Sequence, residues 1–256
     1  MNHRGIEMRR VVIIIAIITC AIFGLMFYQY HVQKQEVEQF DIYQSVLNDK
    51  TTALYEQAKD WSKPIVIDTQ DSRLAPDFQV MADFMLHIMV KNAELRNSYL
   101  RNLKDAQWDK FLDVQRLEQD KKNNYVETEQ MLNQVDEMIN VYQKSLDEHQ
   151  QEIQKEIKAL PIKARFRRYL TEALVKNAEL DGDQKLFNLE KQSYAKAQQA
   201  FTILKSQKWE VKNNTFLFEN QNVVNEFNQL FQDMLALDKQ MKQISQSTKK
   251  ELEKTL

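Results

Sequence analysis

The sequence predicts an all-α protein, in which a single N-terminal transmembrane helix precedes an elongated antiparallel helical bundle with one small β-hairpin. Three observations predict this fold: residues 11–28 carry no charge, three glycines and three prolines are spread over 256 residues, and residues 223–244 carry an apolar repeat of 3.5 residues. Sheets and phosphate-binding loops need frequent turns and clustered glycines, so Rossmann, P-loop and barrel folds are disfavoured. We divide the chain into a short cytoplasmic N-terminus (1–10), a transmembrane anchor (11–30) and an exported helical-bundle domain (31–256).

The first hydrophobic run is long enough to cross a bilayer. From Val11 to Tyr28 it would span about 27 Å as a helix. Arg9 and Arg10 precede it and mark the cytoplasmic side, while aromatic residues up to Tyr30 collect at its far end, where the headgroup layer favours them. The run therefore predicts a single-pass protein of a bacterial inner membrane with its domain in the periplasm.

Two alternatives to an uncleaved anchor are open for this hydrophobic run, a cleaved signal peptide and a lipidated cysteine. A cleaved signal peptide would need a shorter run, followed promptly by a small-x-small site and polar sequence. Lipidation would use Cys20, but Thr19 stands before it where Gly, Ala or Ser is normal, and apolar residues continue after it. Cys20 is the only cysteine, which excludes an internal disulfide and a cysteine-based zinc site.

Prolines bound the first two helices of the exported part. The first helix has apolar residues from Val37 to Trp61 and ends before Pro64, because proline disfavours helix in the residue before it. Residues 62–75 are predicted as a connection, with an extended stretch at 65–67. Pro76 and Asp77 open the second helix. Residues 78–90 are apolar nearly all round and should be its most buried part.

Three further helical segments follow. The first begins after Trp108 and runs to Pro161, with a break expected at residues 119–124 and a capping box at Asn124 and Glu127. The next covers residues 162–207, with a turn at 181–183. The last carries the 3.5-residue repeat, which is typical of bundles and coiled coils. Replacing Phe227 or Leu230 in it by alanine should cost on the order of 2–5 kcal/mol if this helix belongs to the core.

One segment reads as β-structure. Residues 209–212 and 215–218 are rich in β-formers and flank Asn213 and Asn214, which tolerate turn conformations. This helix–hairpin–helix pattern resembles the C-terminal part of a family of uncharacterised proteobacterial envelope lipoproteins. The resemblance lies in the C-terminal fifth of the chain and implies a bacterial envelope setting without a known activity. Its residues are Val211, Asn213, Phe216, Phe218, Asn225 and Leu230.

The polar residues show no catalytic, cofactor-binding or metal-binding pattern. The four histidines lack ligand spacing, and His149, on an apolar stripe, is interpreted as a hydrogen-bonded core or boundary histidine rather than a catalytic base. Asp181-Gly182-Asp183 starts like a calcium loop, but Leu186 stands where an EF-hand requires glycine, so a turn is expected. Methionines at helical spacing are interpreted as core residues, with an adaptable binding groove as the alternative.

A basic cluster surrounds Pro161. We expect it at the end of the domain farthest from the membrane. In this prediction the first helix leaves the bilayer, the second returns toward it and the third leaves again. The third segment would be up to roughly 80 Å long. There it would contact an anionic partner, such as peptidoglycan carboxylates or an acidic protein; the alternative is a solvated turn. The candidate contact residues are Lys158, Lys163, Arg165, Arg167 and Arg168.

These observations favour a binding or scaffold module without chemistry of its own. The net charge is −2 and Arg4, Arg9 and Arg10 lie before the anchor, so the exported part has a mild acidic excess and no general footprint for nucleic acid. The expected partners are the membrane and a protein or envelope component, and heptads also allow a homo-oligomer. The alternatives are a helical sensory module that signals through a partner, and a division or cell-wall scaffold.

Overall fold

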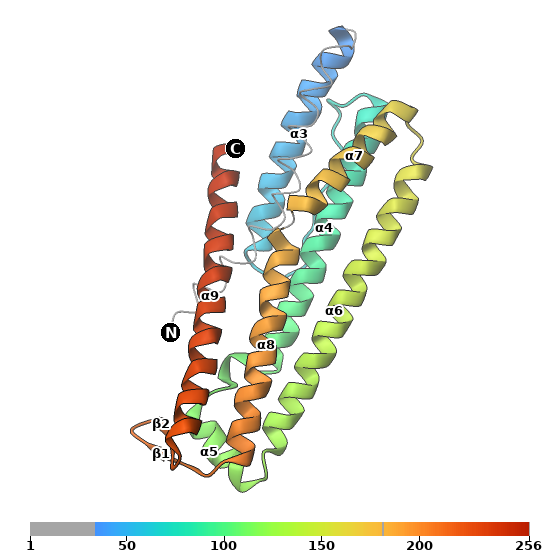
Figure 1. Ribbon diagram of the computed structural model, residues 1–256. Helices are drawn as coiled ribbons and strands as arrows, with labels where there is room; N and C mark the ends of the chain where they lie inside the picture. The colour runs from blue at the N-terminus through green and yellow to red at the C-terminus, as the bar shows by residue number, and fades with distance from the viewer. Residues whose placement is uncertain (1–33, 181, 256) are drawn as a thin grey trace. The chain divides into compact units, whose positions relative to one another are not determined.

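The computed structural model describes residues 34–180 and 182–255, which are mostly helical (Figure 1). This confirms the predicted helical class and the single antiparallel hairpin. The helices are α3 (Lys34–Ala58), α4 (Pro76–Asp105), α5 (Val114–Lys122), α6 (Val126–Ala159), α7 (Ala164–Leu180), α8 (Gly182–Ser206) and α9 (Gln221–Thr255), with a 3₁₀ turn η2 (Trp108–Lys110); the strands are β1 (Trp209–Lys212) and β2 (Thr215–Phe218).

The predicted anchor at 11–30 lies outside the described residues. Among the helices from residue 34 onward, none is both long and apolar enough to cross a membrane. The anchor therefore stays a prediction from the sequence.

The chain forms two compact units. Among the described residues, unit 1 comprises residues 34–98, 143–180, 182–183 and 244–255, and unit 2 comprises residues 99–142 and 184–243. Helices α4, α6, α8 and α9 contribute residues to both units. The single exported domain at 31–256 remains a prediction, and the two units are described separately below.

In unit 1, α3 and α4 run in the same direction. Gln39 on α3 accepts a hydrogen bond from the Ala75 N–H (2.7 Å) just before α4, and the Phe40 ring lies 6.4 Å from that of Phe78. Further along, Thr51 of α3 meets Met89 of α4 at 4.0 Å. Residue numbers rise together along the two helices, so the expectation that the second helix returns toward the start of the first is wrong.

The return path is the connection between the two helices. Residues 59–75 run back along α3: the Val66 backbone pairs with Gln57, and the Gln70 carbonyl accepts from Lys50 (3.1 Å). Side chains of α3 thus satisfy the backbone of an extended segment that is not a strand. The predicted connection is confirmed, and Pro76 opens α4 as expected.

The core of unit 1 is built mainly from α3, α4, α6 and α7. Residues 78–89 of α4 supply its densest part, which confirms the predicted burial of this stretch, and three methionines there are fully buried. The ring of Phe166 on α7 lies 5.2 Å from that of Phe78. The most buried large side chains are Tyr43, Leu47, Leu54, Met81, Met85, Leu86, Met89, Ile157 and Leu170.

His149 is buried, as predicted, but among the described residues neither of its ring nitrogens has a hydrogen-bond partner, so the predicted hydrogen bond is not found there. Burial lowers its pKa, and the nearby charge of Lys91 lowers it further, while Glu152 at 3.8 Å opposes the shift. Because the folded pKa is depressed, the folded state resists protonation. Stability is therefore complete above the unfolded pKa of about 6.5 and falls as the pH drops below it.

We expect wild-type protein to melt at a lower temperature at pH 5.5 than at pH 7.5, and the His149→Leu variant to lose much of this difference because it has no proton to take up. The matched control is His87→Leu, since His87 is exposed on α4. Melting curves at both pH values test this. An unchanged pH difference in the His149 variant would contradict the prediction.

In unit 2, aromatic side chains join the helices. The rings of Tyr99 and Tyr142 stack at 4.7 Å, and Phe187 of α8 meets Tyr142 edge-on at 4.9 Å. The Tyr194 hydroxyl donates to the Leu132 carbonyl (3.0 Å). On α9, the predicted repeat is buried at Phe227, Leu230 and Leu237. The last helix therefore belongs to the core, as predicted.

A break between α5 and α6 is present at residues 123–125, whereas residues 119–122, predicted to belong to it, are still in α5; its cap also differs from the prediction. Asn124 and Tyr125 both have positive φ (56° and 61°), and α6 begins only at Val126. The buried carboxylate of Asp120 accepts from the N–H groups of Glu127 (3.1 Å) and Thr128 (2.8 Å), so it caps α6 from the end of α5. The capping box at Asn124 and Glu127 is wrong. A turn was also predicted at residues 181–183. In the structure α7 ends at Leu180 and α8 begins at Gly182, and Asp181 lies outside the described residues.

Candidate functional site

The hairpin of unit 2 is a tight two-residue hairpin. Strands β1 and β2 pair Trp209 with Phe218 and Lys212 with Thr215. The two turn residues, Asn213 and Asn214, have φ values of 51° and 57°. Positive φ at both central residues is typical of a type I′ turn, which matches the twist of the strands. The turn therefore fixes the register of every residue in the hairpin.

Trp209 anchors the hairpin to the rest of unit 2. It is 3% exposed, and its indole N–H donates to the Tyr125 hydroxyl (2.9 Å) and the Leu204 carbonyl (2.8 Å). Burial raises the pKa of Tyr125, and its hydroxyl donates to the Leu204 carbonyl (2.7 Å). The ammonium of Lys121 lies 4.3 Å from the centre of the indole ring, as a cation–π contact. Contacts with Tyr125, Leu204 and Lys121 thus fix the start of β1.

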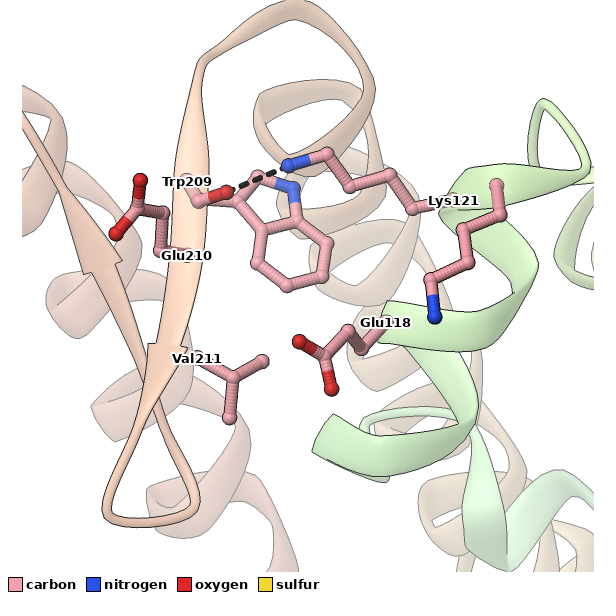
Figure 2. Close-up of a pocket in the computed structure, with 6 residues that line it drawn as sticks. Glu118, Lys121, Trp209, Glu210 and Val211 are labelled. Atoms are coloured by element: carbon pink, nitrogen blue, oxygen red, sulfur yellow. Dashed lines mark hydrogen bonds between the residues drawn. The ribbon is translucent and has the colours of Figure 1, made fainter.

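A groove of about 540 Å³ lies between α5 and β1. Figure 2 shows Glu118 and Lys121 on α5 facing Trp209 and Val211 on β1 across it. Four of the side chains lining it are charged: Glu118, Lys121, Lys122 and Glu210. The indole of Trp209 and the aliphatic side chain of Val211 supply the apolar part of the lining.

The groove runs along the open edge of β1. In an antiparallel pair, hydrogen-bonded and non-hydrogen-bonded pairs alternate, and the residues flanking a two-residue turn are hydrogen-bonded. Trp209 and Val211 therefore direct their backbone N–H and C=O groups away from β2. Lys121 donates to the Trp209 carbonyl (2.5 Å), which agrees with this register. No described residue outside the hairpin bonds the Val211 backbone, which is left open to a partner.

The basic cluster predicted from the sequence lies in unit 1, at the connection of α6 and α7. Lys163 donates to Glu36 (3.1 Å) near the start of α3 and lies 3.9 Å from Asp77, and Arg165 also bonds Glu36. Arg167 donates to the Leu160 (3.0 Å) and Ile162 (2.5 Å) carbonyls. Three of the five candidate contact residues are therefore engaged within the chain.

The other two candidates, Lys158 and Arg168, are exposed and form no ion pair with any described residue. Arg165 and Arg167 are half-buried. Of the three arginines in the cluster, Arg165 and Arg167 hold the turn together and Arg168 is open to solvent. Replacing Arg165, Arg167 and Arg168 at once would change the fold as well as the surface.

The cluster also lies at the other end of the unit from the one predicted. Because α4 runs parallel to α3 and α6 runs antiparallel to α4, the turn after α6 comes back to the start of α3 (Figure 1). The contact between Lys163 and Glu36 shows this directly. The sequence predicted that the first helix leaves the membrane, the second returns toward it and the third leaves again. This is wrong because the extended connection, and not a helix, runs back along α3.

The groove was not predicted from the sequence. Trp209 and Val211 were recognised as parts of a strand, but the opposing wall comes from α5, whose last residues (119–122) were predicted to be part of a break. A polar helix beside a two-stranded hairpin gives no local signal of a site. Among the residues that the structure describes, no group of His, Cys, Asp or Glu side chains could hold a metal ion.

Comparison with protein-family models, with curated proteins and with solved structures finds no match to this chain. The resemblance to envelope lipoproteins stays a prediction.

Proposed function

We propose that this chain is a single-pass protein of a bacterial inner membrane, with its N-terminus in the cytoplasm and its helical part in the periplasm. In this proposal the helical part is a non-enzymatic binding module, and its site is the groove between α5 and β1. The uncharged run from Val11 to Tyr28, preceded by Arg9 and Arg10, supports the anchor.

The observation that carries the binding role is the open edge of β1 at Val211. An extended peptide can add to such an edge, where its backbone gains hydrogen bonds and its side chains enter neighbouring pockets. Here the backbone N–H and C=O of Val211 face a groove whose other wall is α5. We therefore propose that the partner is a protein with an extended segment, held by strand addition and by the charges of Glu118 and Lys122.

Crosslinking in native membranes tests the site. A photoreactive amino acid at Glu118 should form a discrete adduct with a partner protein, whereas one at Val141, which is 55% exposed on α6 and does not line the groove, should not. Val211→Pro should abolish the adduct, because proline removes the outward N–H without removing a ladder hydrogen bond between β1 and β2.

The matched control is Leu217→Ser, on the neighbouring strand. Leu217 is 46% exposed and does not line the groove, so this variant should keep the adduct. Circular dichroism should show both variants folded. Equal adducts at Glu118 and Val141, or an adduct that survives Val211→Pro in a folded protein, would argue against a groove-bound partner.

Self-association is a further part of the proposal. The repeat on α9 is directed into unit 2, and the same helix exposes Phe231 and Leu235, each 41% exposed and one helical turn apart. This pair is a small apolar patch of the kind that a second copy could cover.

A further inference from the structure

The strongest unused surface is the basic turn between α6 and α7. Lys155, Lys158 and Arg168 are exposed there, and no described acidic side chain forms an ion pair with them. The nearby acids Glu36 and Asp77 are already paired with Lys163 and Arg165. Glu152 and Glu156 on α6 are also exposed, but from residue 157 to residue 168 the exposed charged side chains are all cations, Lys158, Lys163 and Arg168, which suits an anionic surface.

The position of the turn limits what that surface can be. Lys163 and Arg165 contact Glu36, which lies six positions after Tyr30, the last residue of the predicted anchor. A chain extends by at most about 3.3–3.6 Å per residue, so Glu36 is within roughly 20 Å of the end of the anchor. The distal position predicted from the sequence would have placed the turn several times farther away. Peptidoglycan is therefore the less favoured occupant.

We propose that the basic turn of unit 1 binds the anionic phospholipid headgroups of the membrane that holds the anchor. This inference rests on the anchor in the proposed function but not on the groove. Each lysine or arginine close to an anionic bilayer adds a small attraction, and several act together. The attraction falls off over about 8 Å at physiological ionic strength, so it requires the turn to lie against the headgroups.

Two ion pairs give this contact a defined orientation. Glu36 holds both Lys163 and Arg165, so the turn cannot swing away from the start of α3 without losing these bonds. Arg167 holds the turn itself through two backbone carbonyls. Lys158 comes just before the turn and Arg168 just after it, so the same bonds fix the positions of their backbones. The unit would thereby stand in one orientation on the bilayer.

Full-length protein in lipid nanodiscs tests the inference. Native Cys20 is replaced by serine and Ala159→Cys, on the exposed last residue of α6, carries a fluorophore. In nanodiscs of phosphatidylglycerol and phosphatidylcholine, a quencher on the lipid headgroups should quench this fluorophore. Quenching should be several-fold weaker in nanodiscs of pure phosphatidylcholine. In the anionic nanodiscs it should weaken as salt is raised to about 0.5 M, because salt screens the attraction between the lysine and arginine side chains and the headgroups.

The double variant Lys158→Gln/Arg168→Gln should lower the quenching in anionic nanodiscs to the level seen in pure phosphatidylcholine. The matched control, Lys144→Gln/Lys239→Gln, removes two exposed lysines from α6 and α9 and should behave as wild type. Quenching that is absent, or equal in both lipids and insensitive to salt, overturns the inference. So does a sacculus pull-down by wild type that the double variant loses, because it would assign the turn to the cell wall.

A separate measurement distinguishes failure of the anchor from failure of the lipid contact. An alkaline phosphatase fused to the C-terminus should be active in cells if the helical part is exported. An inactive fusion, beside an active cytoplasmic reporter, overturns the proposed topology and the lipid contact with it. An active fusion combined with absent quenching overturns the lipid contact alone.

Discussion

Replacement of Phe227 by alanine should lower the free energy of unfolding by about 3–5 kcal/mol. Phe227 is 7% exposed on α9, and its ring lies 5.4 Å from that of Phe216 and 5.2 Å from that of Phe218. Both partners are on β2, so the substitution would leave a cavity between the last helix and the hairpin. The hairpin limits relaxation into this space because its register is fixed by the turn. Urea unfolding of the full chain in detergent, followed by circular dichroism, measures the loss.

The matched control lies one turn away on the same helix. Phe231 is 41% exposed, and Phe231→Ala should change the free energy of unfolding by no more than about 0.5 kcal/mol. Equal effects of the two substitutions, or unchanged unfolding in Phe227→Ala, would mean that α9 is a detachable arm.

Trp209→Ala should destabilise the protein by a similar amount, about 3–5 kcal/mol, because it removes the buried indole from the centre of the network beside the groove. The ring meets Phe216 at 5.1 Å and Lys121 at 4.3 Å, and its N–H serves both Tyr125 and Leu204. The same variant should lose the crosslink at Glu118, since the indole lines the groove.

Trp209→Phe separates the two contributions of this side chain. It keeps an aromatic ring on β1 and loses the N–H donor, so the expected cost is about 1–3 kcal/mol. Leu204 would still accept from Tyr125, which keeps one hydrogen bond of the network. If Trp209→Phe is as destabilising as Trp209→Ala, the hydrogen bonds rather than ring packing hold the hairpin.

The parts of the fold that depend on local sequence were predictable. Pro76 begins α4, Asn213 and Asn214 form the hairpin turn, and the 3.5-residue repeat buries its apolar positions on α9. Each of these depends on the backbone preference of one residue or on the period of one helix. Such signals do not need knowledge of what lies across the molecule.

The parts that depend on distant partners were not predictable. Asp120 caps α6 only because a left-handed turn at Asn124 and Tyr125 folds α5 back. Lys163 and Arg165 bond Glu36, which lies 127 and 129 positions earlier in the chain. The direction of α4 was missed for the same reason. A connection that returns along α3 through side-chain hydrogen bonds looks, in sequence, like any other polar linker.

The pairing of the basic turn with Glu36 also bears on the order in which unit 1 is assembled. It joins residues 127 to 129 positions apart, whereas the contacts of Gln39 with Ala75 and of Phe40 with Phe78 join residues fewer than 40 apart. Long loops close slowly, so α3, its connection and α4 can associate early in synthesis, well before α7 exists. The ion pairs of Glu36 are thus among the last contacts of α3 to form.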